Sequence, residues 1–381
     1  MSEEDKLINV RVMTWNVGFG SSKPDFIPSD QARAQAVLKV VQPLEIDLIA
    51  LQEMANRTYS DQGHFSLKEF IEQNDEQLQY LHFQPAVSLG RENSYPYGKL
   101  AGLTQRLKII EQQAGPGIWI RFSNGWHLRN LYAEKMSARP YPEIQRPLPH
   151  PLYMGENPPP PGLEADRRFS AGRDEEDRPV IWSRVGNDSS SDRPKLFLLA
   201  LHLPTLKGEE QNKPPGDLTK SQQNLAERVL RLPAARLHEW TVDQLGTEIR
   251  LYYLQQIMAQ IKRMQEFWQG DDEANKCVFI LAGDFNFYHS NGNNSPRAKE
   301  EQFLSENNFV PAKTSGLTRP FSARTGERLV DNIWVKGAES VREIDLRNYD
   351  IRLVDNNHSA PEIWNTISDH YPVIADIEVK F

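Results

Sequence analysis

The chain has 381 residues, and its 52 Asp and Glu against 44 Lys and Arg give a formal net charge of −8. This length suits one large α/β domain or two ordinary ones, and the acidic balance excludes an overall electrostatic attraction to nucleic acid. The single cysteine, Cys277, excludes an intramolecular disulfide. No apolar run approaches the ~18 residues of a membrane span, and no positive region followed by an apolar one opens the sequence. We therefore expect a cytoplasmic protein without a membrane partner.

Apolar runs typical of buried strands recur along the chain, and each ends on a polar residue. Helical patterns lie between the runs, and they begin at Ser29, at Ser66 and at Thr241, the last being the longest. Strands that alternate with such helices predict an α/β fold. In chain order the strand-like runs cover residues 13–16, 48–53, 197–202, 279–286, 328–335 and 367–370.

Two segments interrupt this alternation. Residues 137–177 are too rich in proline to hold regular ladders, and we interpret them as a surface insertion. A substrate-facing lip is the alternative, because this segment immediately precedes Arg178. Residues 207–237 form a second insertion with a polar start and a later part compatible with a helix. Since the strand motifs interleave over the whole length, we predict a single domain, 1–381, that carries both insertions.

The polar residues at the strand ends indicate one shared site. An ionised carboxylate at the end of a buried strand is costly unless it is paired or holds a cation. Carboxylates suit a hard divalent cation, histidines suit proton transfer, and asparagine side chains donate to phosphate oxygens. The candidates, in chain order, are Asn16, Glu53, His202, Asp284, Asn286, Asp331, Asp369 and His370.

These motifs in this order, including Gly-Asp-Phe-Asn at 283–286 and Ser-Asp-His at 368–370, resemble the endonuclease/exonuclease/phosphatase (deoxyribonuclease I-like) superfamily. The resemblance runs from about Val10 to Val379. It implies a four-layer α/β/β/α sandwich with two packed mixed β-sheets inside and helices outside. It also implies a metal-dependent hydrolase acting on phosphoesters.

The resemblance assigns the metal to Glu53, the main Mg²⁺ ligand of the family, with Asp369 beside it. One or two carboxylates with substrate phosphate and water satisfy Mg²⁺, and Mn²⁺ may substitute. Asn16 would hold a water or a phosphate oxygen near the metal, and so counts as both a metal and a phosphate residue. As a structural alternative, a strand-end asparagine is often a turn residue.

Asp284 and Asn286 stand at i and i+2, so on an extended backbone both would point to one side. Asp284 would orient or deprotonate the attacking water, and Asn286 would donate to a non-bridging phosphate oxygen. Gly283 would permit an unusual backbone path before them. An Asx-turn is the structural alternative, which explains either residue but not the pair.

His370 needs an orienting partner, and the family pattern supplies Asp331, whose buried charge would otherwise be costly. His202 is expected to be a leaving-group acid or a phosphate ligand, although the sequence identifies no partner for it. Arg178 resembles a phosphate-contacting arginine of the family. Arg121 and Arg184 occupy similar strand-end positions, so this assignment is shared among three residues.

Departures from subfamily patterns narrow the range of possible substrates. Elements that the inositol phosphatases carry around residues 282–288 and 330–332 are absent, as is a signature of abasic-site endonucleases before Asp331. The run 368–373 looks more like the deoxyribonuclease I and sphingomyelinase members. We therefore predict a Mg²⁺-dependent phosphodiesterase that works by direct in-line water attack, most simply a DNA endonuclease, with DNA favoured over RNA and no obligatory protein partner. The alternatives are a phosphatase or sphingomyelinase-like enzyme on a small or lipid phosphoester, and a catalytically silent binding module.

Overall fold

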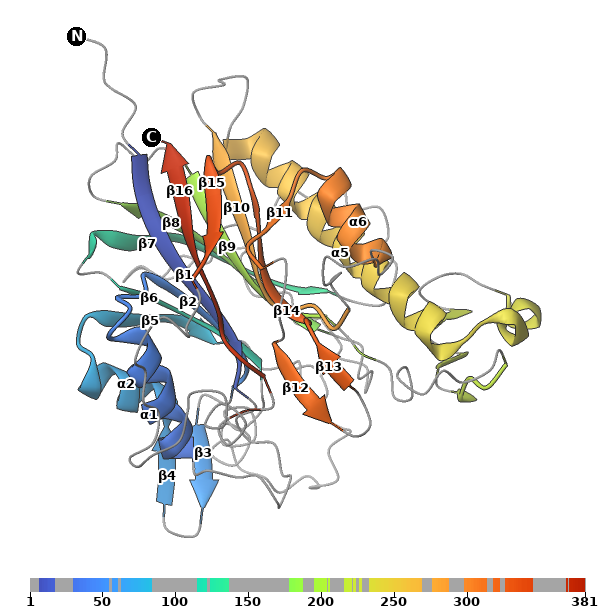
Figure 1. Ribbon diagram of the computed structural model, residues 1–381, viewed down its shortest axis with the longest axis horizontal. Helices are drawn as coiled ribbons and strands as arrows, with labels where there is room; N and C mark the ends of the chain where they lie inside the picture. Colours follow the sequence, from blue (N-terminus) through green and yellow to red (C-terminus); the bar gives the residue numbers. More distant parts are fainter. Residues whose placement is uncertain are drawn as a thin grey trace, which may run out of the picture.

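Two six-stranded β-sheets form the centre of the molecule in the computed structural model (Figure 1). Two further sheets have two short strands each. The structure describes residues 7–17, 30–54, 57–60, 63–83, 115–121, 124–136, 178–187, 195–203, 205, 216–220, 222–223, 226–227, 233–268, 276–287, 298–313, 318–322, 326–344, 368 and 370–380.

The first sheet contains both ends of the described chain. Its order is β15-β16-β1-β2-β6-β5, and it is mixed, because β1 runs antiparallel to β16 and parallel to β2. A parallel pair needs a crossover connection, and helix α1 (Asp30–Val41) lies between β1 and β2 in the chain. The strands are β1 (Leu7–Asn16), β2 (Leu48–Met54), β5 (Leu78–Phe83), β6 (Gly115–Arg121), β15 (Ser340–Glu343) and β16 (Val373–Lys380).

The second sheet has the order β11-β14-β10-β9-β8-β7 and is mixed in the same way. Its central strand β10 runs parallel to β9 and antiparallel to β14. Helix α5 (Val242–Trp268) lies between β9 and β10 in the chain. The strands are β7 (Trp126–Met136), β8 (Arg178–Asn187), β9 (Lys195–His202), β10 (Cys277–Asp284), β11 (Val310–Pro311) and β14 (Asp331–Lys336).

Alternation along the strands divides the apolar side chains among three cores. Val12 of β1 and Leu198 of β9 belong to the core between the two sheets. Trp15 points the other way, into a core shared with α1 and α2 (Leu67–Asn74). Leu199 likewise packs in a core shared with α5 (Val242–Trp268) and α6 (Lys299–Glu306). Three cores separate four layers, so the predicted α/β/β/α sandwich is confirmed.

The predicted helices are present. The Ser66 hydroxyl accepts from the backbone N–H of Glu69 at 3.2 Å and caps α2. Thr241 and Gln244 form a reciprocal capping box at the start of α5, with contacts of 3.1 and 2.9 Å. Ser29, the expected cap of α1, lies outside the described residues. None of the helices in the described part of the chain has the length and apolar composition needed to cross a bilayer.

The two insertions differ in how much of them is described. The proline-rich segment 137–177 lies outside the described residues, so its role as insertion or lip stays a prediction. The segment 207–237 is described in part. It includes short helical pieces after residue 219 and leads into a 3₁₀ helix, Ala234–Glu239, that ends just before α5. The expectation of helix in the later part of this segment is confirmed for the residues described.

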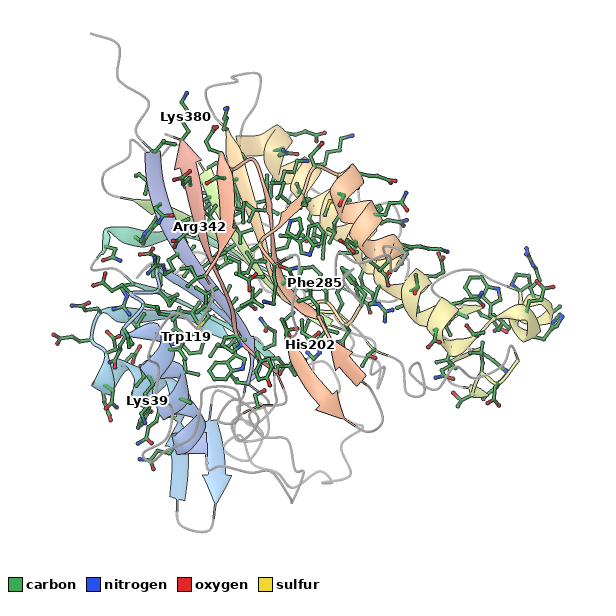
Figure 2. The ribbon with its side chains drawn as sticks, in the orientation of Figure 1. Lys39, Trp119, His202, Phe285, Arg342 and Lys380 are labelled. Carbon is green, nitrogen blue, oxygen red and sulfur yellow. The ribbon has the colours of Figure 1, made fainter. Side chains whose placement is uncertain are left out.

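The hairpin β12 (Arg319–Ser322) and β13 (Gly326–Arg328) lies at the end of the sheets where β14 begins (Figure 1). The hairpin β3 (Arg57–Ser60) and β4 (Gly63–Ser66) extends beyond the first sheet. His202 lies toward this end of the molecule, whereas Lys380 lies at the opposite end (Figure 2). The two hairpins and the strand end that carries His202 therefore lie at the same end of the molecule.

Candidate active site

Strand register places five of the expected site residues at one end of the two sheets. On the second sheet, Asp284 ends β10 and is paired with His202 on β9 and with Asp331 on β14. On the first sheet, Asn16 ends β1. His370 lies just before β16, which runs antiparallel to β1. The sheets therefore bring together residues separated by more than 350 positions in the chain.

Gly283 allows β9 and β10 to approach closely at the site. A Cβ atom at this position would lie 1.9 Å from the carbonyl oxygen of Leu201, far inside the 3.0 Å that real Cβ atoms respect. The register pairs Gly283 with Leu201 and, one step further, Asp284 with His202. Glycine is therefore required for the placement of Asp284 opposite His202.

The Oδ2 atom of Asp284 is the centre of the cluster. It accepts a hydrogen bond from Asn16 Nδ2 at 3.2 Å. It lies 3.5 Å from His202 Nε2 and 3.8 Å from His370 Nε2. Asp284 is 2% exposed, while the His202 side chain is 13% exposed. His202 thus has a partner that the sequence did not identify, and one carboxylate oxygen faces two imidazoles.

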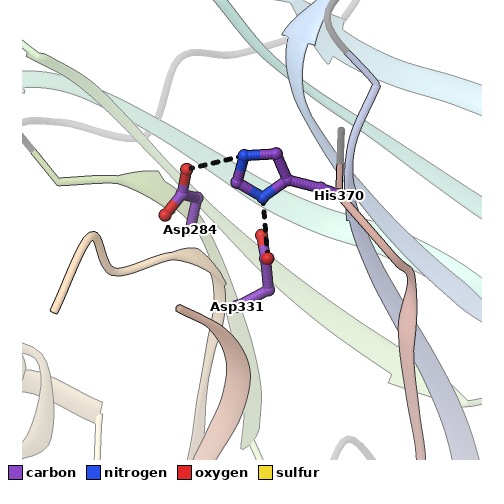
Figure 3. Close-up of side chains that lie close together, drawn as sticks. All are labelled: Asp284, Asp331 and His370. Atoms are coloured by element: carbon purple, nitrogen blue, oxygen red, sulfur yellow. Dashed lines mark hydrogen bonds and ion pairs between the residues drawn. The ribbon is translucent and has the colours of Figure 1, made fainter. Parts of the chain in front are cut away.

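Asp331 holds His370 from the opposite side of the ring (Figure 3). His370 Nδ1 lies 2.8 Å from Asp331 Oδ2, so the predicted hydrogen bond between these residues is present. A proton on Nδ1 for this bond leaves Nε2 directed toward Asp284. The Nε2 atom lies 3.8 Å from Asp284 Oδ2, which is an ion-pair distance when the ring is protonated there. Asp331 Oδ1 is buried and has no hydrogen-bond partner among the described residues.

The segment before β16 is fixed to the end of β1. The Ser368 hydroxyl donates to the carbonyl oxygen of Asn16 at 2.5 Å and accepts from the backbone N–H of His370 at 3.1 Å. The indole Nε1 of Trp15 donates to the carbonyl oxygen of His370 at 3.0 Å. These three contacts hold the His370 backbone against the first sheet, and they involve Trp15 and Ser368 in roles that sequence reasoning did not assign.

Asn286 differs from its expected geometry. Its φ of 51° places it in the left-handed region, so the extended backbone assumed for Asp284 and Asn286 is wrong. The Asn286 N–H donates to Asp284 Oδ1 at 2.9 Å, which makes an Asx-turn. Its Nδ2 donates to the carbonyl oxygen of Leu203 at 2.8 Å. The turn occupies Oδ1 of Asp284 and leaves Oδ2 for the histidines.

For Glu53 and Arg178 the structure gives the position of the backbone but not of the side chain. Asp369 lies outside the described residues. Gln52 pairs with Asn16, so Glu53 follows at the same end of the first sheet. Arg178 begins β8, which runs antiparallel to β9 and therefore starts near the end of β9 that carries His202. The side chains of Glu53 and Arg178, and all of Asp369, lie outside the described residues. Their predicted roles stay predictions.

Two arginines that shared the phosphate assignment have structural roles instead. Arg121 is buried, and its guanidinium lies 3.2 Å from Asp75 Oδ2 and donates to the carbonyl oxygen of Ile46 at 3.1 Å. Its strand β6 pairs antiparallel with β2, so Arg121 lies at the start of β2, away from Glu53. The guanidinium of Arg184 lies over the Trp268 ring at 4.2 Å. The register places both residues away from the strand ends that carry His202 and Glu53, so their suggested equivalence to Arg178 is wrong.

Three of the buried groups are close enough to share a cation. The ligand atoms of Asp284, Asp331 and His370 lie within 4.8 Å of one another. Two carboxylates and an imidazole could hold a divalent ion. An ion there would compete with the 2.8 Å bond between His370 and Asp331. The described residues thus form a proton-transfer pair beside an acidic oxygen, and the same three groups are a possible metal site.

A sequence model of the Endonuclease/Exonuclease/phosphatase family matches residues 13–370. The chain belongs to this family. Members include nucleases and other phosphodiesterases, and their hydrolysis generally depends on a divalent metal. None of the curated proteins matches the chain.

Solved structures of the family share the fold. An endonuclease/exonuclease/phosphatase from Bacteroides vulgatus has a TM-score of 0.51 and 14% identity, covering 98% of this chain and 99% of its own. A family protein from Bacteroides thetaiotaomicron has a TM-score of 0.50 and 12% identity, covering 99% and 100%. The human Nocturnin catalytic domain with bound sulfate has a TM-score of 0.49 and 15% identity, covering 99% and 97%. The likeness to the two Bacteroides structures, at 14% and 12% identity, is one of fold alone.

Proposed function

We propose that this protein is a divalent-metal-dependent phosphodiesterase that hydrolyses its substrate by direct in-line attack of water. The observation that carries the proposal is Asp284 Oδ2, which lies 3.5 and 3.8 Å from two imidazoles, one of them bonded at 2.8 Å to Asp331. Buried groups able to take up and release protons on both sides of one oxygen suit general acid–base chemistry. Membership of the family supports the reaction class.

We assign each residue a role that its contacts support. Asp284 orients the attacking water and accepts its proton at Oδ2. His370 carries positive charge, which Asp331 stabilises through its contact with Nδ1. His202, the most exposed of the three groups around Oδ2, is placed to protonate the leaving oxygen. Asn286 and Asn16 donate hydrogen bonds to phosphate oxygens, in addition to the bonds by which they hold Asp284 and Leu203.

We propose Glu53 and Asp369, with Asn16, as the residues that hold the metal, Mg²⁺ with Mn²⁺ as a substitute. The fit rests on donor chemistry: an amide and two carboxylates supply the oxygen ligands that Mg²⁺ prefers. The 3.2 Å bond from Asn16 to Asp284 links this position to the proton-transfer cluster. When bound, the ion stabilises charge on the phosphoryl oxygens.

A nucleic acid is the proposed substrate, with DNA favoured over RNA and Arg178 contacting phosphate. We also propose that the chain is one domain and that it acts in the cytoplasm, which cell fractionation would test. A small or lipid phosphoester is the second candidate. The formal charge of −8 favours it, because an acidic protein gains little general attraction to a polyanion.

The test incubates purified protein and Mg²⁺ with plasmid DNA, single-stranded RNA and bis-p-nitrophenyl phosphate. We expect turnover that stops in EDTA and returns with Mg²⁺ or Mn²⁺, and full turnover in chelator would refute the metal dependence.

Asp284→Asn should lower kcat by at least ~100-fold, the lower range for lost acid–base help. Asp376→Asn is the matched control, because it removes a buried carboxylate from β16, where Asp376 pairs with Arg11 far from the site. Binding of substrate without turnover of any of the three would instead indicate a silent binding module.

A further inference from the structure

Thr318 contacts both chain segments that carry the His370 and Asp331 pair. The residue is fully buried and precedes the β12–β13 hairpin. Its Oγ1 accepts hydrogen bonds from the backbone N–H groups of Val330 and Asp331, each at 2.9 Å. Its carbonyl oxygen accepts from the N–H of Tyr371, the residue after His370, at 2.5 Å. One residue therefore holds the backbone on both sides of the catalytic hydrogen bond.

This double contact matters because Asp331 and His370 belong to different sheets. Asp331 begins β14 of the second sheet, and His370 precedes β16 of the first. Their 2.8 Å bond therefore depends on how the two sheets are positioned at this end. The backbone of Val330 also accepts from the N–H of Phe285, which connects the same segment to the residue after Asp284.

Lys313, five residues before Thr318 in the sequence, also contacts both sheets. The Asn332 carboxamide accepts from the backbone N–H of Lys313 at 3.0 Å and donates to its carbonyl oxygen at 2.8 Å. The Lys313 ammonium forms an ion pair with Glu343 on β15 of the first sheet. The bond from Tyr371 goes to the carbonyl oxygen of Thr318 and does not involve its hydroxyl, so a change at the hydroxyl would act mainly on Asp331.

We infer that Thr318 is a positioning residue that sets the separation of Asp331 and His370. The hydrogen bonds of Thr318 among the described residues all go to backbone groups, so it acts through the backbone of the two segments. Its effect on the rate rests on the proposed function. Its effect on the state of the His370 ring does not, because the Nδ1 hydrogen bond exists without substrate.

The test compares Thr318→Val with Thr318→Ser. Valine keeps the shape and removes the acceptor of two buried N–H groups, whereas serine keeps the acceptor. In Thr318→Val we expect the low-field proton resonance of the His370 Nδ1–H to shift or disappear. The kcat should fall by roughly 100-fold, the scale of a 1 Å misplacement, with KM little changed. Thr318→Ser should keep both the wild-type resonance and the wild-type kcat.

Two controls separate positioning from general destabilisation. Thr241→Val also removes a hydroxyl that accepts from a backbone N–H, that of Gln244 at 3.1 Å, but it lies at the start of α5. It should leave the His370 resonance and kcat unchanged below its unfolding temperature. In a His370→Ala background, Thr318→Val should produce no further loss of kcat, because residues that act as one unit are non-additive.

The inference is overturned if Thr318→Val keeps the wild-type resonance, or if its loss of kcat multiplies with that of His370→Ala. If the valine variant does not fold, Thr318→Cys replaces it, since a thiol is a weak acceptor. An intermediate shift of the resonance would support the inference, and a wild-type resonance would refute it. If the wild-type protein cleaves no phosphodiester, the proposed function fails while the resonance still decides the role of Thr318.

Discussion

The close approach of β9 and β10 predicts that Gly283→Ala will damage the site more than the fold. The new Cβ would lie 1.9 Å from the Leu201 carbonyl oxygen, and a tolerable contact needs at least 3.0 Å. The strands must therefore part by at least 1.1 Å, the difference between these distances. The displacement occurs one residue before Asp284, whose Oδ2 lies 3.5 Å from His202 Nε2.

Two magnitudes follow from that displacement. Forcing a methyl group into a packed position typically destabilises a protein by about 1–3 kcal/mol. A misplacement of about 1 Å in a catalytic group can lower the rate by roughly 100-fold. We therefore expect Gly283→Ala to remain folded at room temperature, with a lower thermal midpoint, and to lose about two orders of magnitude in kcat.

Gly337→Ala is the matched control for this substitution. Its Cβ would lie 2.6 Å from the Cys277 carbonyl oxygen, at the opposite end of β10, and its φ of +90° adds backbone strain. Circular dichroism melts should show destabilisation of both variants, and initial rates measured below both midpoints should fall only for Gly283→Ala. Equal rates for the two variants would refute the reasoning that the close approach serves the site.

The other predictions concern the buried acids. Asp331→Asn should cost nearly as much kcat as His370→Ala, and the double variant should be little worse than either, because their 2.8 Å bond makes them one unit; multiplicative losses would contradict this. Burial tends to raise the pKa of Asp376, but its bonds to Arg11 and Arg342 outweigh burial and lower the pKa below the usual 3.8. The stability it contributes is therefore present above about pH 4 and is lost as the pH falls through the lowered value. Asp376→Asn should reduce stability at pH 7 and weaken the acid dependence of thermal melts, and an unchanged pH profile would argue against the pairing.

Strand and helix patterns were sufficient to predict much of the fold. Runs such as 197–202 and 279–286 are apolar because both faces of these strands are covered, and the capping box at Thr241 identified the start of α5. The pairing order of the strands was not predictable from periodicity. It depends on contacts between strands distant in sequence, such as β1 with β16. The resemblance to a family, rather than the pattern, supplied the four-layer arrangement.

The site was predictable where a buried charge would be costly without a partner. Asp331 in an apolar run required a partner, and His370 is that partner. The bond network of Thr318 was not predictable, because a buried threonine before a hairpin has no distinctive pattern. The contact of His202 with Asp284 depends on strand register, which the sequence does not state. The conformation of Asn286 escaped prediction because an Asx-turn interrupts the strand there.

The second sheet pairs Asp284 with His202 on one side and with Asp331 on the other, so three residues of the proposed site occupy a single row across three neighbouring strands. The alignment of these side chains depends on the register of all three strands. A slip of any one strand by a single residue would turn its group to the opposite face of the sheet. Substitutions and insertions in the connecting loops leave the row intact as long as the register holds. Loops around the rim can therefore diverge to suit different substrates, while the strand registers keep the chemistry the same.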